Sequence, residues 1–377
     1  MKIKRKHQLD FFRGVFLIII TFDHFLTDNN VIKRFTYEFV GWITAAEGFV
    51  FLSGLTAGII YSYKYSEKGY SFINSASRNR AWIIYKYHIV VFLISLILTI
   101  SIKPYAHYWQ KEFSYLIDYP LVTSILGIFL IYKPNVFDIL PMYALFVLFI
   151  PLVISSLHKG YYWRILLVSC LLYAAGNMNR YFRITDYLVG NENINIGYFD
   201  VLCWQLLFVL GLLSGFLYYT GKTKALQQNK SLFYASVAVV VISFAVKNAH
   251  IDLKYGFDYL INKPTLGPLR IVNFTALVFM FVFIATKKET WFTTKAMCVL
   301  GKYSLEVFSF HILLMIIFRP IKEYFNHFYS IRISEHFYIY PFGTLMLFLV
   351  VLPALFLVPL LMKRRMASAP PAPAKVS

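Results

Sequence analysis

Long apolar runs separated by short polar segments repeat along the whole chain. A helix that crosses a bilayer needs about 17–25 mainly apolar residues, and each run is long enough. The pattern therefore predicts an all-α polytopic membrane protein with about ten transmembrane helices. We expect these helices at residues 11–27, 41–63, 81–102, 138–156, 162–178, 199–219, 230–247, 268–286, 296–318 and 341–362.

Basic residues are distributed unevenly among the connecting segments. Segments on the side of the N-terminus hold many Lys and Arg and few acids, whereas the opposite segments are nearly balanced. Cytoplasmic loops carry an excess of Lys and Arg, so both termini are expected in the cytoplasm. An odd number of helices would break this alternation.

Composition agrees with a membrane protein, because 59% of the 377 residues are apolar and only 15% are charged. Soluble domains average about 25% charged residues. The net charge of +19 is explained by topology and by attraction to anionic lipid head groups, so no nucleic-acid partner is expected. Residues 1–365 are expected to form a single transmembrane domain, followed by a disordered cytoplasmic tail at 366–377 that is rich in Pro and Ala.

Several familiar features are not expected. The basic N-terminus resembles a signal peptide, but Asp23 and His24 interrupt the apolar run, so we expect no cleavage. The three cysteines fall in apolar runs and are expected to be thiols without a disulfide framework. No P-loop, dinucleotide-binding fingerprint or metal motif is present, and no metal is expected. Within the outer segment 103–137, residues 121–132 are too short to span and are expected to be interfacial or re-entrant.

Ionisable residues interrupt the first two runs, where charge is costly and is kept mainly for chemistry or transport. Arg13 and His24 are eleven residues apart, close to three helical turns, so they share a helix face. His24 is expected in the outer third of the membrane, and Glu47 at a similar depth. Asp23 or Glu47 could then orient the imidazole as a general base. A purely structural Asp–His–Glu network is the alternative.

A basic cluster is expected at the inner end of the third run. Arg78, Arg80 and Lys86 lie there, and Arg13 would face the same vestibule. Guanidinium groups hold phosphates bidentately, so the cluster is a candidate site for a phosphorylated ligand. Ordinary anchoring at the inner membrane edge is the alternative.

Polar residues also gather at the predicted outer helix ends, where they would suit a sugar. Lys302 and Glu306 are four residues apart and could pair, and His311 either lines the reaction cavity or is merely hydrogen-bonded. Gly54 and Gly58 would allow close helix approach, within the chain or in a homodimer. The candidate substrate-binding residues are Asp138, Tyr143, Arg270, Asn273, Glu306 and His311.

Several motifs resemble known membrane acyltransferases. Leu9-Asp-Phe-Phe-Arg-Gly with Asp23-His24 is similar to the first-helix signature of the acyltransferase 3 superfamily. The chain more specifically resembles the OpgC family, in stretches that lie between residues 9 and 311. These stretches are Ala45-Ala-Glu-Gly-Phe-Val-Phe-Leu-Ser-Gly, Arg80-Ala-Trp, Asp138-Ile-Leu-Pro-Met-Tyr, Leu266-Gly-Pro-Leu-Arg-Ile-Val-Asn-Phe and Leu300-Gly-Lys-Tyr-Ser-Leu-Glu-Val-Phe-Ser-Phe-His.

The resemblance implies a bacterial inner-membrane enzyme that transfers succinyl groups from the cytoplasmic side to osmoregulated periplasmic glucans. It implies acyl-CoA, most simply succinyl-CoA, as a co-substrate and no permanently bound cofactor. His24 takes the catalytic role, while Arg13, Arg78 and Arg80 engage the coenzyme. Direct attack and an acyl-histidine relay both remain open.

Two other classes of function remain open. A proton-coupled transporter or flippase would use the buried charges as a proton relay, and a structural partner in an envelope assembly would need no chemistry. The acceptor could also be another envelope polysaccharide. Binding of acyl-CoA would discriminate, because only the enzyme hypothesis requires it.

Overall fold

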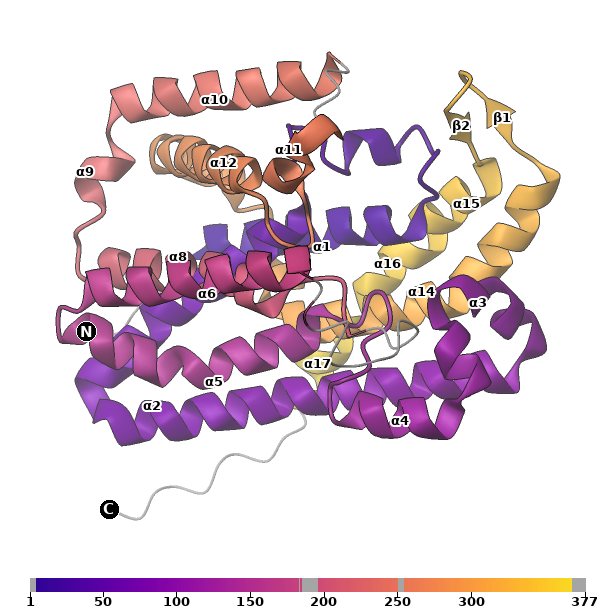
Figure 1. Cartoon of the computed structure of the whole chain (residues 1–377), viewed down its shortest axis with the longest axis horizontal. Helices are drawn as coiled ribbons and strands as arrows, with labels where there is room; N and C mark the ends of the chain where they lie inside the picture. The colour runs from indigo at the N-terminus through magenta and orange to yellow at the C-terminus, as the bar shows by residue number, and fades with distance from the viewer. Residues whose placement is uncertain (1–4, 183, 185–195, 250–253, 368–377) are drawn as a thin grey trace.

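The computed structural model describes residues 5–182, 184, 196–249 and 254–367, which form helices and one short β-hairpin (Figure 1). Each expected apolar run is helical within this part of the chain. Seven of the described helices are long and apolar enough to cross a membrane, which confirms an all-α membrane protein. From residue 368 onward, the predicted tail lies outside the described residues.

The long helices follow the predicted runs closely. They are α1 (His7–Phe25), α2 (Ala45–Ser101), α5 (Ile139–His158), α6 (Tyr162–Phe182), α8 (Val201–Tyr219), α10 (Lys230–Asn248), α12 (Pro268–Lys287) and α14 (Ser304–Phe328). The shorter elements are η1 (Lys33–Phe35), α3 (Lys103–Asp118), α4 (Pro120–Ile128), α9 (Lys224–Gln227), α11 (Lys254–Ile261), η2 (Glu289–Phe292), α13 (Lys295–Lys302), β1 (Ile331–Arg332), β2 (Tyr338–Ile339), α15 (Pro341–Met346), η3 (Leu347–Val351), α16 (Leu352–Leu355) and α17 (Leu357–Ala367).

Two expected spans, 41–63 and 81–102, belong to the single element α2. The helix turns back sharply between its two halves (Figure 1). Gly69 makes the turn with φ 74° and ψ −175°, a conformation that is open essentially to glycine alone. The polar segment that the sequence predicts between these spans is therefore mostly helical.

The ninth expected span is interrupted, which corrects one sequence prediction. Tyr303, with φ −109° and ψ 36°, separates α13 from α14, so Lys302 and Glu306 lie on different helices. Their predicted ion pair is not formed, and the Lys302 amine instead lies 5.2 Å from the centroid of the Tyr303 ring.

Residues 103–137, which were predicted to form an outer segment, contain the helices α3 and α4, and α4 covers most of the expected re-entrant piece. Trp109 and Phe113 are buried, and the Trp109 indole donates to the Ile316 carbonyl of α14 at 3.4 Å. Arg319 of α14 pairs with Glu112 of α3 at 2.7 Å. These contacts fix α3 against the α14 helix.

Gly54 and Gly58 contact α8 within the chain. A Cβ at Gly54 would lie 2.2 Å from the Phe208 carbonyl oxygen, and one at Gly58 would lie 2.3 Å from that of Leu212. Gly211 and Gly215 of α8 face α2 equally closely. Small residues let helix backbones approach, so this pair of glycines serves an internal contact.

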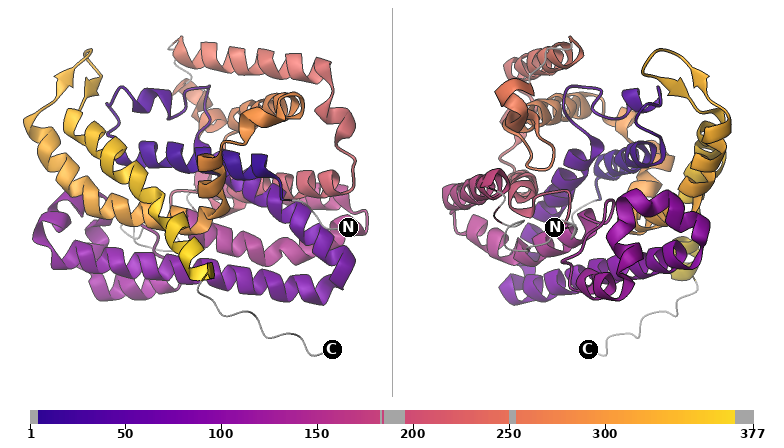
Figure 2. Two further views of the ribbon diagram at one scale, coloured as in Figure 1. Left: turned by 180° about the vertical axis from the view of Figure 1, so that it is seen from behind. Right: turned by 45° about the vertical axis from the view of Figure 1, so that its right-hand side comes forward.

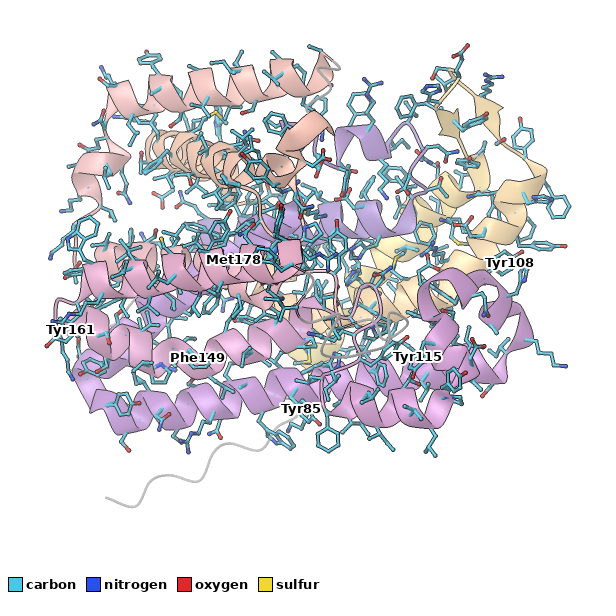
Figure 3. The ribbon with its side chains drawn as sticks, viewed as in Figure 1. Tyr85, Tyr108, Tyr115, Phe149, Tyr161 and Met178 are labelled. Atoms are coloured by element: carbon cyan, nitrogen blue, oxygen red, sulfur yellow. The ribbon has the colours of Figure 1, made fainter. Side chains whose placement is uncertain are left out.

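The hairpin β1–β2, from the C-terminal part of the chain, is hydrogen-bonded to the loop that follows α1. Tyr338 donates its backbone N–H to Asn29 at 2.9 Å and accepts from Val31 at 3.0 Å. At the far edge, α10 packs on α12 (Figure 2). Outward-lying side chains such as Phe149 and Met178 are 54% and 58% exposed (Figure 3), as expected for a surface that faces lipid.

Candidate functional site

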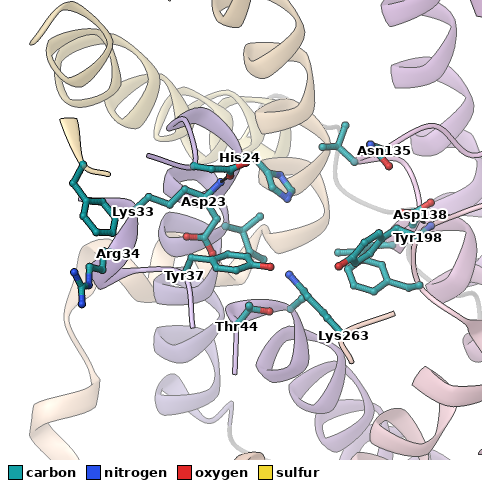
Figure 4. A pocket seen from close by; sticks show the side chains of 17 residues that line it. Asp23, His24, Lys33, Arg34, Tyr37, Thr44, Asn135, Asp138, Tyr198 and Lys263 are labelled. Atoms are coloured by element: carbon teal, nitrogen blue, oxygen red, sulfur yellow. Dashed lines mark hydrogen bonds and ion pairs between the residues drawn. The ribbon is translucent and has the colours of Figure 1, made fainter. Parts of the chain in front are cut away.

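A cavity of ≈ 670 Å³ opens at the end of α1 where His24 lies. Its walls come from α1, from the loop that contains η1, and from the segments that precede α5, α8 and α12 (Figure 4). The ionisable side chains and tyrosines that line it are Asp23, His24, Asp28, Lys33, Arg34, Tyr37, Asp138, Tyr198 and Lys263. Its chemistry is therefore polar and of mixed charge.

His24 is paired with a second histidine from α14. His24 Nδ1 lies 3.2 Å from His311 Nε2, and the two rings are stacked with centroids 5.4 Å apart. His311 Nδ1 is hydrogen-bonded to the Phe308 carbonyl oxygen. The structure thus brings together two residues that the sequence singled out separately.

Asp23 also lines the cavity, next to His24 in the chain but without a hydrogen bond to it. Its side chain is buried, and its Oδ1 atom has no hydrogen-bond partner. The Thr36 hydroxyl, from the loop after η1, donates instead to the Lys33 carbonyl at 3.2 Å. Asp23 is therefore a wall residue of the cavity, and His311 occupies the place predicted for a carboxylate beside the imidazole.

Glu47 does not contact His24, which corrects the second predicted partner. Its carboxylate caps the start of α2, where Oε2 accepts from the Thr44 N–H at 3.0 Å. Oε1 binds Arg270 Nη2 at 2.6 Å and Nε at 3.0 Å. A buried ion pair is costly to break. Glu47 therefore has a structural role, as the partner of Arg270 and the cap of α2.

Arg270 bridges two carboxylates, which removes it from the set of free substrate-binding groups. Its Nη1 atom lies 2.7 Å from Glu38 Oε1, and Lys247 pairs with the same carboxylate. Burial alone would raise the pKa of Glu38, but the charges of Arg270 and Lys247 hold this pKa below its usual value. These ion pairs of Glu38 hold the loop after α1 against α12, which carries Arg270, and α10, which carries Lys247.

The other predicted substrate residues divide by position. Asp138 lines the cavity and accepts the Tyr198 N–H at 3.1 Å. Asn273 is buried and accepts the Trp42 N–H at 3.2 Å, so it supports the loop. Tyr143, whose ring packs against Phe208, and Glu306 are not among the cavity residues.

The basic residues that were predicted to form one cluster are only partly close to one another in the structure. Arg13 donates to the Leu52 carbonyl at 3.3 Å, while its buried Nε has no partner, and it lies within electrostatic range of Arg80. Arg78 and Lys86 are exposed, and the Lys86 amine lies 6.0 Å from the Trp82 ring centroid. Of the three predicted partners of Arg13, Arg80 is the one within electrostatic range of it.

A second cavity, of ≈ 440 Å³, is an apolar groove between α1, α2 and α12. Phe12, Phe16 and Leu52 line it, and Lys6 lies at one end. Thr44 lines both this groove and the cavity at His24. The two cavities therefore approach each other at the start of α2.

Sequence reasoning missed part of the site. Lys33, Tyr37 and Tyr198 lie in short connecting segments between the long helices, where no hydrophobic period fixes a direction for a side chain. Burial raises the pKa of Tyr37, so this phenol stays protonated and can donate to a hydroxyl group. Lys322, whose amine donates to the Phe25 carbonyl at 2.6 Å, was also missed, because it lies beyond the end of the predicted run 296–318.

Family comparison gives the chemical context. A family model described as OpgC protein matches residues 5–355, which is most of the chain. The chain belongs to the OpgC family. The family implies a transferase that acylates osmoregulated periplasmic glucans. Neither a search of curated proteins nor a search of solved structures returned a significant match.

This OpgC family member carries no evident metal centre in the part of the chain that the structure describes. No group of three His, Cys, Asp or Glu side chains there is arranged to hold an ion. Cys170, Cys203 and Cys298 are free thiols and do not line the cavity at His24. The groups available for acyl transfer in this cavity are therefore its imidazole, carboxylates, phenols and amines.

Proposed function

We propose that this OpgC family member is a bacterial inner-membrane O-acyltransferase that moves a succinyl group from cytoplasmic succinyl-CoA to a hydroxyl of a periplasmic glucan. It crosses the membrane ten times with both termini in the cytoplasm. The observation that carries the proposal is the His24–His311 pair at the wall of a polar cavity. A sugar requires such a mixture of donors and acceptors.

The hydrogen bonds of the pair define which nitrogen acts as the base. His311 Nδ1 donates to the Phe308 carbonyl, so its Nε2 carries a lone pair when the ring is neutral. That lone pair accepts the proton of His24 Nδ1, and His24 Nε2 is left as a free lone pair. His311 thereby positions His24 as a general base.

In the proposed reaction, His24 Nε2 takes the proton of a glucosyl hydroxyl while the hydroxyl oxygen attacks the thioester carbon. A carbon–oxygen bond forms, and the carbon–sulfur bond of the resulting intermediate breaks. The proton on His24 then passes to the departing coenzyme thiolate. An acyl-histidine relay uses the same nitrogen as the nucleophile. A carbon–nitrogen bond then forms as the coenzyme thiolate leaves, it breaks when the glucosyl hydroxyl attacks the acyl carbon, and the hydroxyl proton passes through the histidine to the thiolate.

The donor approaches from the inner side. Arg13, with an unpaired buried Nε, and Arg80 bind its phosphates, while Arg78 and Lys86 add positive charge at the same end of the third span. The uncharged arm of the coenzyme lies in the apolar groove, whose volume of ≈ 440 Å³ suits a slender chain. Thr44 marks the point where the thioester meets the polar cavity.

Mass spectrometry of envelope glucans tests this function. Cells that lack the protein are supplied with wild type, His24→Ala, or the control His327→Ala, which removes an exposed histidine of α14. Succinyl-sized mass increments are expected with wild type and with the control, and not with His24→Ala at equal membrane levels. Unmodified glucans in all strains would contradict the proposed function, and modification by His24→Ala would contradict the mechanism.

The transporter hypothesis makes a different prediction. A proton-coupled transporter would need no coenzyme, so purified protein would show no saturable binding of succinyl-CoA. Loss of glucan modification together with absence of donor binding would favour transport.

A further inference from the structure

Three cations line the cavity at His24, and they differ in what neutralises them. Lys33 forms an ion pair with Asp28 at 2.7 Å. Arg34 is exposed, and its guanidinium lies 5.0 Å from the Phe337 ring centroid. Lys263, between α11 and α12, has no ion pair with a carboxylate of the described residues within 4 Å.

The surroundings of Lys263 are aromatic. Its amine lies 4.7 Å from the centroid of Tyr37 and 5.9 Å from that of Phe199. Burial and the charge of Arg270 lower the pKa of Lys263, and the nearby carboxylates Glu47, Glu38 and Asp23 only partly oppose this effect. Glu38 and Glu47 already bind Arg270, and Asp23, which lines the same cavity, forms no ion pair with Lys263 within 4 Å among the described residues. The half-buried amine is therefore not paired directly with a carboxylate of this part of the chain.

The amine and the base face one space. Figure 4 shows the Lys263 side chain directed from the cavity wall toward the side on which the His24 imidazole lies. An anionic group attached a few bonds from a carbonyl could therefore reach Lys263 while that carbonyl lies near His24. Arg270 cannot fill this role because it is bound to two carboxylates, and Lys86 does not line the cavity.

We propose that Lys263 binds the terminal carboxylate of a dicarboxylic acyl group, such as succinyl, and so selects the acyl donor. The inference rests on the proposed function and makes it more specific. An ammonium–carboxylate hydrogen bond is stronger than a neutral one, and the acyl carboxylate supplies the missing anion. A monocarboxylic acyl group of the same length leaves the half-buried amine unpaired.

The test compares succinyl-CoA with butyryl-CoA, whose acyl chain has the same number of carbons but no carboxylate. Wild type and Lys263→Met are reconstituted in lipid nanodiscs with a glucan acceptor, and kcat/KM is measured for both donors. Removing one partner of such a charge pair reduces the succinyl-to-butyryl ratio by roughly 10²-fold. Because the readout is a ratio within one variant, a general loss of folded protein does not mimic it.

Matched variants sharpen the result. Lys33→Met removes a cavity lysine that is already paired and is expected to keep the ratio, and Lys263→Arg retains the cation and is expected to stay selective for succinyl. If Lys263→Met lowers transfer from both donors equally, the residue serves the acceptor or the fold and the inference is wrong. The inference is also wrong if Lys263→Met changes transfer from neither donor, since the succinyl-to-butyryl ratio then stays as in wild type. A wild type that uses neither donor overturns the proposed function itself.

Discussion

The hydrogen bonds at His311 determine how His24 can act. His311 is buried and receives its orientation from the Phe308 carbonyl, and its other nitrogen faces His24 at 3.2 Å. It does not itself line the cavity. In the proposed mechanism, its role is to fix the tautomer and orientation of His24, which does line the cavity.

Substitution of His311 separates this role from simple packing. His311→Leu leaves the Nδ1 proton of His24 without an acceptor, and we expect kcat to fall by about 10²-fold with little change in KM. His311→Gln keeps an acceptor oxygen and is expected to recover part of the activity. Steady-state kinetics on both variants, together with their melting temperatures, test this; equal activity in the two variants would exclude the positioning role.

At the scale of elements, the contact between α2 and α8 leaves no room for a side chain. A Cβ at Gly58 would lie 2.3 Å from the Leu212 carbonyl and 3.0 Å from Gly215 Cα, and backbone atoms cannot rotate away. With a side chain at Gly58, the two helices must separate or shift. The packing of the core beside them would be disturbed as well.

Gly58→Ala is therefore expected to destabilise the protein by about 1–3 kcal/mol, which is the usual cost of overpacking. Ile60→Ala on the same helix, at a side chain that is 39% exposed, serves as the control and should change stability little. Thermal unfolding in detergent measures both. A mass measurement in detergent that changes only for Gly58→Ala, with no loss of stability, would instead indicate a contact between copies.

At the scale of the whole molecule, the turn of α2 and the β1–β2 hairpin lie at opposite ends of the bundle (Figure 1). In a chain without its native cysteines, Glu67→Cys and Glu335→Cys place one thiol at each exposed end. With the proposed orientation, an impermeant thiol reagent applied to spheroplasts should label the second and not the first. Labelling in the reverse pattern would invert the topology and move His24 to the cytoplasmic half.

The apolar pattern predicted the positions of the helices well because burial in lipid requires long apolar runs. It could not predict the break at Tyr303, since a single residue leaves the hydropathy of its run unchanged. The same limit applies to charge partners. Glu47 and Arg270 are 223 residues apart, and only the packing of α2 against the start of α12 decides that Glu47 meets Arg270 and not His24.

The Gly69 turn has a consequence for how the protein is made. No loop separates the two halves of α2, and the chain reverses direction at Gly69. We therefore expect the two halves to enter the bilayer as one helical hairpin. The positive-φ backbone at Gly69 would then be needed already at insertion, before the cavity at His24 forms.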